Sequence, residues 1–225
     1  MSEETGYPAK VIRYSIATRV FYWFIRTLVL IVITLLFRLQ GRGKEHQIKR
    51  GRAIFASNHI AWIDPLVVGV SIFRELSILG KKELFAIPVL NWIIRGLHTH
   101  PVDRAGYSRG VLDMFKTLLE NDHAILIFPE GTRQKTGKLG EGKIGVGMLS
   151  VWTNAPVVPM FVWGTDKPLK ALLFQHRFKV AMGEPVYPPE VHDAAERKHA
   201  YHQVTEEVMA RIAKLKAEVE GTTTN

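Results

Sequence analysis

The sequence predicts an α/β fold: a single mixed, largely parallel sheet flanked by helices, preceded by an N-terminal amphipathic helical segment. Two patterns carry this prediction. Beyond residues 41–44, short β-branched runs alternate with longer runs of helical periodicity, as they do when helices connect the strands of one sheet. Before residue 41, arginines punctuate a long aromatic and aliphatic run, which is typical of an amphipathic helix. With 225 residues, the chain fits one domain with a sizeable core.

The N-terminal run has the composition of a helix that lies in a membrane interface. Arg19 and Arg26 are seven residues apart and share a helical face with Tyr22 between them, so we expect their cations to face anionic headgroups. The longest uncharged run, Thr27–Phe37, has 11 residues. As a helix it would span about 16 Å, against a hydrocarbon core of about 30 Å. The alternatives are an ordinary core helix and a single tilted span with Arg26 buried.

Three parts are therefore expected along the chain. Residues 1–43 form a basic and aromatic membrane-interface segment, residues 44–220 form one catalytic domain that includes a C-terminal helix, and residues 221–225 form a flexible tail. Glu3 and Glu4 open the chain, and no small-residue cleavage site follows the apolar run, so the sequence contains no recognisable cleavable signal peptide.

Net charge and cysteine content limit the partners and the kinds of site that the chain can have. Lys and Arg exceed Asp and Glu by 30 to 21, a formal charge of +9 that favours phosphates, nucleic acid or acidic lipid as partners. No nucleic-acid module signature is present, and the aromatic residues cluster with aliphatic ones, so we expect no nucleic-acid partner. The absence of cysteine excludes disulfides, thiolate zinc sites and a cysteine nucleophile.

Six short runs predict strands because they are aliphatic or β-branched and are bounded by turn-forming residues. In chain order they are Ala53–Ser57, Leu76–Leu79, His100–Val102, Ala124–Phe128, Pro156–Trp163 and Phe178–Met182. The last two are apolar enough to be central strands.

The segments between these strands predict helices. The pair Asp64-Pro65 favours a helix start, because aspartate is a common N-cap and proline suits the first helical position. The expected helices run from Asp64 through Val70, over Glu83–Leu97 around Pro88, over Tyr107–Glu120, over Lys143–Trp152, and over Glu190–Glu220 as one helix or two.

A histidine and an aspartate follow the first strand. His59 stands in the turn before the expected helix, and the chain between it and Asp64 can fold back to bring the imidazole to the carboxylate. An imidazole whose second ring nitrogen is held by an acid can take a proton from a hydroxyl and so act as a general base. The competing interpretation is that Asp64 only caps the helix and His59 is a turn residue.

A second polar motif follows the most apolar strand. The segment Pro129–Arg133 places an acid, a glycine, a hydroxyl and an arginine where ligands collect in open α/β sheets, beyond the carboxyl end of a strand. Gly131 permits close backbone approach, and Arg133 offers a planar fork of donors suited to phosphate. Lys143 follows at the start of the next helix and adds a point charge.

Two weaker patterns have less support. Gly137–Lys143 resembles a nucleotide-binding loop, but Ile144 stands where a Mg²⁺-binding Ser or Thr is required. His98 and His100 could form a metal pair on one strand face, but no third ligand is evident nearby, so no metal is predicted.

Together these motifs resemble those of the glycerolipid acyltransferase family, which includes the 1-acyl-sn-glycerol-3-phosphate (lysophosphatidate) acyltransferases. The matching features are the Asn-His-x4-Asp motif, a second block that closes on an arginine, the Phe-Pro-Glu-Gly-Thr-Arg block and a proline-centred strand. In this sequence they are Asn58, His59 and Asp64; Gly96–Arg104; Phe128–Arg133; and Val157–Met160. The resemblance covers roughly residues 54–185 and implies a glycerol-3-phosphate acyltransferase-like fold. Gln134 departs from the serine often seen after the third block.

The resemblance implies roles for individual residues. His59 and Asp64 would be the catalytic dyad, and Arg104 and Arg133 would bind the acceptor phosphate, assisted by Lys143 or Lys82. Glu130 would position acceptor hydroxyls, Asn58, Gly131 and Thr132 would belong to the substrate site, and Val158 and Pro159 would line the acyl or acceptor channel.

The same resemblance implies a reaction and a location. The enzyme would transfer a fatty acyl group from acyl-CoA or acyl carrier protein, as co-substrate and without a cofactor, to lysophosphatidate, making phosphatidic acid. We expect a peripheral or monotopic protein on the cytoplasmic face of an anionic membrane. The alternatives are the same chemistry on another lysophospholipid, a lyso-amino-acid lipid or glycerol 3-phosphate, and a non-catalytic membrane-binding protein with the same fold.

Overall fold

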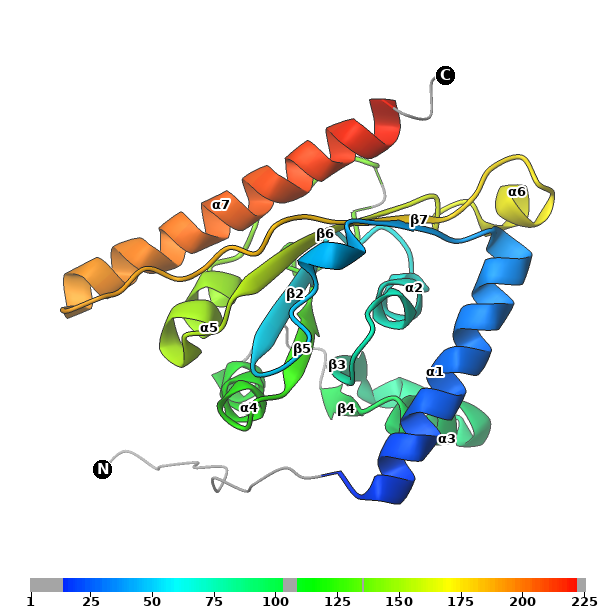
Figure 1. Ribbon diagram of the computed structural model, residues 1–225, viewed down its shortest axis with the longest axis horizontal. Helices are drawn as coiled ribbons and strands as arrows, with labels where there is room; N and C mark the ends of the chain where they lie inside the picture. Colours follow the sequence, from blue (N-terminus) through cyan, green and yellow to red (C-terminus); the bar gives the residue numbers. More distant parts are fainter. Residues whose placement is uncertain (1–13, 103–108, 135, 222–225) are drawn as a thin grey trace.

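A seven-stranded sheet forms the centre of the protein, whose computed structural model describes residues 14–102, 109–134 and 136–221 (Figure 1). Its strand order is β1-β7-β6-β2-β5-β3-β4. Strands β6, β2, β5, β3 and β4 are parallel to one another, whereas β7 pairs antiparallel to β6 and β1 pairs parallel to β7. The strands are β1 Gln40–Arg42, β2 Ala53–Ser57, β3 Leu76–Lys81, β4 Thr99–Val102, β5 Ala124–Ile127, β6 Val157–Trp163 and β7 Lys179–Met182. The predicted fold class, a mixed and largely parallel sheet, is confirmed.

Helices cover both faces of the sheet. The helices are α1 Ile16–Phe37, α2 Asp64–Ser71, α3 Pro88–Gly96, α4 Arg109–Glu120, α5 Gly145–Thr153, α6 Pro168–Leu172 and α7 Ala194–Gly221, with short 3₁₀ helices over Lys44–His46 and Lys82–Ala86. One core joins α4, α5 and α7 to one face, and a second joins α1, α2 and α6 to the other (Figure 1). Because β2, β5 and β6 lie between both layers, their residues are almost fully buried.

The helix α1 is oriented differently from the expectation. Arg26 is buried, and its guanidinium donates to the backbone oxygens of Val70 (2.7 Å) and Ile72 (2.9 Å), where α2 ends. These carbonyls lack partners within α2, so the cation satisfies them and suits the negative end of the helix dipole. Arg19 pairs with Glu75 at 2.7 Å. The expectation that both cations face headgroups was therefore wrong for Arg26, and the surface that α1 exposes is apolar instead.

Several elements differ from those expected. Pro88 begins α3 rather than lying inside a longer helix, because proline lacks the amide that an interior position needs. Strand β1 lies before residue 44, so the sheet begins inside the segment assigned to the N-terminal helix. The short helix α6 was not predicted, and α7 is one helix that extends through Gly221. The rest of the expected tail, residues 222–225, lies outside the described residues.

Candidate active site

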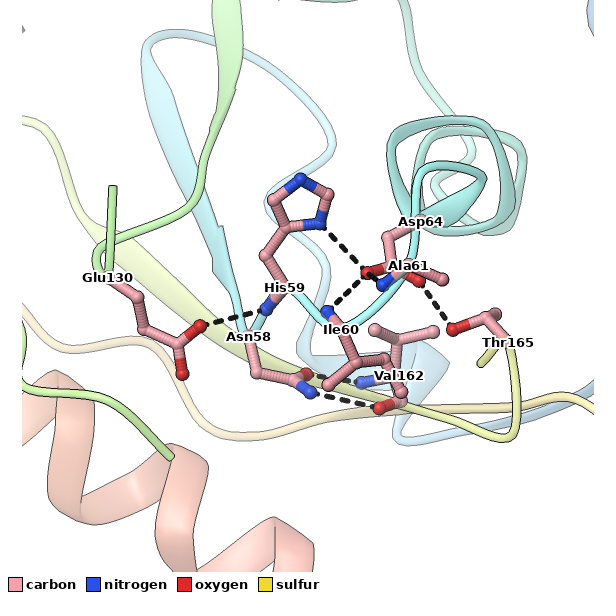
Figure 2. A network of polar contacts seen from close by, with 8 residues as sticks. All are labelled: Asn58, His59, Ile60, Ala61, Asp64, Glu130, Val162 and Thr165. Atoms are coloured by element: carbon pink, nitrogen blue, oxygen red, sulfur yellow. Dashed lines mark hydrogen bonds and ion pairs between the residues drawn. The ribbon is translucent and has the colours of Figure 1, made fainter. Parts of the chain in front are cut away.

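The turn between β2 and α2 holds the histidine and the aspartate together (Figure 2). His59 Nδ1 lies 2.9 Å from Asp64 Oδ2. The Asp64 side chain is 0% exposed and that of His59 is 17% exposed. A carboxylate only accepts hydrogen bonds, so the imidazole proton sits on Nδ1 and the lone pair on Nε2. The pair thus has the arrangement of an oriented general base.

Asp64 does not cap its helix. It is the first residue of α2, and the cap position before it, Ile63, makes no side-chain cap hydrogen bond. The Asp64 carboxylate instead reaches back into the preceding turn, where Oδ2 accepts from the amides of Ile60 (2.6 Å) and Ala61 (2.7 Å). The cap interpretation was therefore wrong, and the carboxylate serves the turn that carries His59.

Thr165 completes the set of partners around this carboxylate. Its hydroxyl donates to Asp64 Oδ1 at 2.5 Å, and both residues are buried (Figure 2). With His59 and the two amides, Asp64 accepts four hydrogen bonds, which fix the orientation of its carboxylate. Thr165 was missed from the sequence, although it follows β6 at the edge of the sheet where ligand-site residues are expected.

Glu130 joins the loop that follows β5 to the turn that carries His59. Its Oε2 accepts from the His59 amide at 3.1 Å and its Oε1 from the Gly140 amide at 3.0 Å. Burial raises the pKa of Glu130, while the two amide hydrogen bonds oppose that rise. The Gln134 amide adds a bond of 2.7 Å to the His59 carbonyl. Glu130 was expected to position substrate hydroxyls, but both of its oxygens order the protein backbone around His59.

A cationic loop lies beside this turn. Gly131 has φ +70°, and an added Cβ would lie 2.7 Å from Lys143 Nζ, so Lys143 packs directly over the glycine. The Lys143 amide also donates to the Pro129 carbonyl at 2.8 Å. Thr132, Arg133 and Lys143 are exposed. This loop therefore exposes a hydroxyl, a guanidinium and an ammonium group, each of which can bind an anion.

The structure does not bring every expected residue to this site. Asn58 is buried, and its side chain bonds to both the amide (2.7 Å) and the carbonyl (3.0 Å) of Val162, which joins the end of β2 to β6 (Figure 2). Val158 and Pro159 are buried inside β6 and pair with Phe55 and Ala56, short of the strand's end. Lys82 directly follows β3 at the same edge of the sheet. Arg104 lies outside the described residues.

The second histidine pattern forms no metal centre. Among the described residues, no group of three or more His, Cys, Asp or Glu side chains is arranged to hold a metal ion. His98 stacks between Tyr14 (ring centroids 3.5 Å apart) and Tyr22 (4.8 Å). Burial lowers the pKa of His98 to about 3, with smaller contributions from His100, His123 and Arg19.

The site matches a known family. The family model described as "Acyltransferase" matches residues 38–163, which is more than half of the chain and includes both motifs. The chain belongs to the acyltransferase family.

Individual acyltransferases agree with this assignment. A crystal structure of the 1-acyl-sn-glycerophosphate acyltransferase of Thermotoga maritima superposes with a TM-score of 0.66 and 27% identity, covering 86% of this chain and 80% of that one. The 1-acyl-sn-glycerol-3-phosphate acyltransferase of Bacillus subtilis is 26% identical over 168 residues, 74% of this chain and 82% of the relative. A chloroplast enzyme of the same name from Brassica napus is 29% identical over 141 residues, 60% of this chain. The match spans only 40% of the Brassica protein's length.

Proposed function

We propose that the protein transfers a fatty acyl group from an acyl thioester, acyl-CoA or acyl carrier protein, to the free hydroxyl of 1-acyl-sn-glycerol 3-phosphate, making phosphatidic acid. The observation that carries this proposal is the His59–Asp64 pair, whose Nε2 is available as a base beside the cationic loop of Arg133 and Lys143. The names of the relatives support the choice of acceptor.

The geometry supports direct attack of the acceptor on the thioester. His59 Nε2 takes the hydroxyl proton as the oxygen forms a bond to the thioester carbonyl carbon, and Asp64 stabilises the imidazolium. The carbon–sulfur bond then breaks, and the proton on Nε2 passes to the leaving thiolate. The phosphate of the acceptor binds Arg133 and Lys143, with Lys82 and Arg104 as further candidates from the sequence. No acyl-enzyme is required.

The surface of α1 supports a site that works at a membrane. By length and apolar composition α1 could cross a bilayer, which alone is weak evidence of membrane association. It is packed against the domain along its length, however, through Tyr22 and Ile25 near its start and Ile33 and Phe37 near its end. A helix covered on one side by its own domain fits an in-plane, interfacial position better than a spanning one. Its outer apolar residues include Ile16, Val20, Phe24, Leu28, Ile31 and Leu35.

We therefore infer a peripheral or monotopic protein on the cytoplasmic face, where it receives the lipid acceptor laterally. Deleting α1 is a poor test of this assignment, because the deletion would uncover the core. Replacing outward-facing Phe24 and Leu28 by serine should weaken vesicle binding and leave the unfolding temperature unchanged. Unchanged binding would contradict the assignment.

A panel of acceptors tests the reaction. Purified protein is given one labelled acyl-CoA, or the same acyl chain on acyl carrier protein, with lysophosphatidate, lysophosphatidylcholine, a lyso-amino-acid lipid or glycerol 3-phosphate, and the products are identified by mass. We expect phosphatidic acid from lysophosphatidate. The product should vanish in His59→Ala, which should still bind vesicles. Preferred acylation of another acceptor would reassign the substrate, and vesicle binding without any transfer would indicate a non-catalytic protein.

Replacing Arg133 by glutamine tests the phosphate site. The variant should raise the KM for lysophosphatidate by about 10- to 100-fold, because it loses a charge-assisted contact, and should leave the KM for acyl-CoA unchanged. Equal rises in both constants would move Arg133 to another role.

A further inference from the structure

A second apolar surface projects from the catalytic domain at α6, separate from α1 in sequence. We define the α6 tip as residues 167–174, which connect β6 to β7. Only Ala171 of this helix is buried, and it joins the core beneath. Leu169, Leu173 and Phe174 are 73%, 67% and 70% exposed. Leu172 is 39% exposed as well. Large apolar side chains that are exposed in a cluster, unlike single scattered ones, indicate an interaction site.

The backbone at Phe174 adds a second observation. Its φ is +60°, a left-handed conformation that is unfavourable for a bulky aromatic residue. The guanidinium of Arg38 lies 4.9 Å from the centre of its ring, and Arg38 also donates to the His176 carbonyl, so the surroundings hold the ring in place. This conformation closes α6, because the amides of Phe174 and Gln175 donate to the carbonyls of Ala171 (3.1 Å) and Lys170 (2.9 Å). The end of α6 therefore presents the Phe174 ring in a fixed orientation.

The charges around the tip favour a lipid surface as its partner. Lys167 and Lys170 are exposed, and Arg38 lies against Phe174; the acid in the adjoining turn, Asp166, is already close to Lys167 Nζ at 3.8 Å. Apolar side chains surrounded by cations complement a bilayer, in which the acyl region lies directly beneath anionic headgroups.

The position of the tip agrees with this partner. The α6 tip lies beside the C-terminal end of α1 (Figure 1), where Leu35 and Leu36 are also exposed, so both elements present apolar side chains in the same region of the molecule. Thr165, which holds Asp64, directly precedes the tip in the chain. A bilayer contact at α6 would therefore be covalently close to the catalytic turn.

We propose that the α6 tip is a bilayer-contact element of the catalytic domain, which inserts Leu169, Leu173 and Phe174 beneath anionic headgroups and holds the catalytic turn at the membrane surface. The purpose of this contact rests on the proposed reaction with a lipid acceptor. The contact itself is independent of catalysis and is measured separately.

The absence of cysteine allows direct measurement in the full chain. Single cysteines at Leu173, at Leu35 of α1 and at Lys198 of α7, on the opposite side of the sheet, are labelled with an environment-sensitive fluorophore. Vesicles contain phosphatidylcholine with or without phosphatidylglycerol, and nitroxide-bearing lipids report depth. We expect the labels at 173 and 35 to shift to the blue and to be quenched in anionic vesicles, and the label at 198 to remain in water.

A variant then links the contact to activity. Leu169→Ser combined with Leu173→Ser should lower partitioning onto anionic vesicles by about tenfold or more, because two apolar contacts with lipid are lost. Transfer to lysophosphatidate embedded in vesicles should fall in parallel, whereas transfer to a short-chain, monomeric lysophosphatidate should not change. Tyr187→Ser is the matched control, since Tyr187 is 67% exposed but lies in the segment that packs against α7. Equal loss with both acceptors would indicate a structural defect and overturn the link to activity.

The other outcomes separate this proposal from the proposed reaction. A label at 173 that stays in water while the label at 35 enters lipid would overturn the α6 contact and leave the acyltransferase assignment intact. Burial of the label at 173 in a protein that acylates no acceptor would support the α6 contact and overturn the acyltransferase assignment. Burial that needs no vesicles and grows with protein concentration would identify a second copy of the chain as the partner. Burial only on addition of acyl carrier protein would identify a protein partner, and either result would overturn the proposal.

Discussion

His59 and His98 are two shielded histidines in the same protein with opposite surroundings. His59 keeps part of its ring exposed, stacks on Phe128, and donates a hydrogen bond from Nδ1 to Asp64. His98 is enclosed between two tyrosine rings, and neither of its ring nitrogens has a hydrogen-bond partner among the described residues. The first arrangement can stabilise an imidazolium, whereas the second suppresses it.

The comparison teaches that burial does not make a histidine a base. A general base needs an acid that stabilises its charged form and an open nitrogen that reaches the substrate. In the proposed reaction His59 meets both requirements, and its acid is itself held by three further donors. His98 contributes ring stacking where α1 packs on the domain.

Removing the His59 imidazole should have the largest effect. His59→Ala is expected to lower kcat by about 10⁴-fold, because the substitution removes the proposed base that takes the hydroxyl proton. The measurement is acyl transfer to lysophosphatidate at saturating substrate. His98→Phe is the matched control and should retain normal turnover; a loss of activity in the control would mean that His98 also supports catalysis.

Asp64→Asn should come next, with kcat lower by about 10³-fold. The amide keeps the shape of the side chain but can donate to Nδ1, which favours the tautomer whose Nε2 carries the proton and cannot act as a base. Nuclear magnetic resonance of ¹⁵N-labelled histidine reports the tautomer directly. An unchanged Nδ1-protonated tautomer together with full activity would refute the role given to Asp64.

The hydroxyl of Thr165 should have a smaller effect. Thr165→Val leaves Asp64 Oδ1 without its donor, and we expect kcat to fall by about tenfold with KM unchanged. Thr165→Ser restores the hydroxyl and should recover most of the rate. If valine and serine behave alike, Thr165 acts through packing and does not position Asp64.

The smallest effect is expected at His98 and concerns stability. A histidine in the unfolded chain binds a proton below about pH 6.5, whereas the pKa of His98 in the folded protein is about 3. The unfolded state therefore binds protons first, and folding stability falls as the pH drops from about 6.5 toward 3.

Phenylalanine at position 98 removes the contribution of His98 to the pH dependence of folding stability, and it removes the unpaired ring nitrogens. His98→Phe should leave the free energy of unfolding at pH 7 unchanged or raise it by about 1 kcal/mol, and should weaken its decline at acid pH. Part of the decline should remain, because burial also lowers the pKa of His100. Denaturant unfolding between pH 4 and pH 7 measures both effects, with exposed His192→Phe as the control. Identical acid profiles in the wild type and His98→Phe would contradict the low pKa.

Much of the sheet could be predicted from the sequence because strands such as β5 and β6 are apolar over their full length. The two motifs could be placed at the carboxyl ends of β2 and β5 for the same reason. The short edge strand β1 could not, since Gln40–Arg42 has no apolar pattern and is defined by pairing with β7, far away in the chain.

The polar partners in the site were harder to predict. A charged residue in an apolar helix suggests an outward direction, but Arg26 finds its acceptors more than forty residues away, at the end of α2. The bond between Thr165 and Asp64 joins residues 101 positions apart. Asn58 was expected in the substrate site because it belongs to the Asn-His-x4-Asp motif, but its side chain is hydrogen-bonded to the backbone of β6. Sequence spacing reports none of these contacts.

The buried guanidinium of Arg26 has a practical consequence for the design of a less apolar form of this protein. Truncation before β1 would leave the carbonyls at the end of α2 unpaired and uncover the part of the core that α1 covers, so the product should aggregate. Redesign of the outer face of α1, with Arg26, Tyr22 and Ile33 retained, keeps the helix as an internal part of the fold. The outer apolar residues of α1 can therefore be replaced by polar ones, whereas the helix itself has to stay.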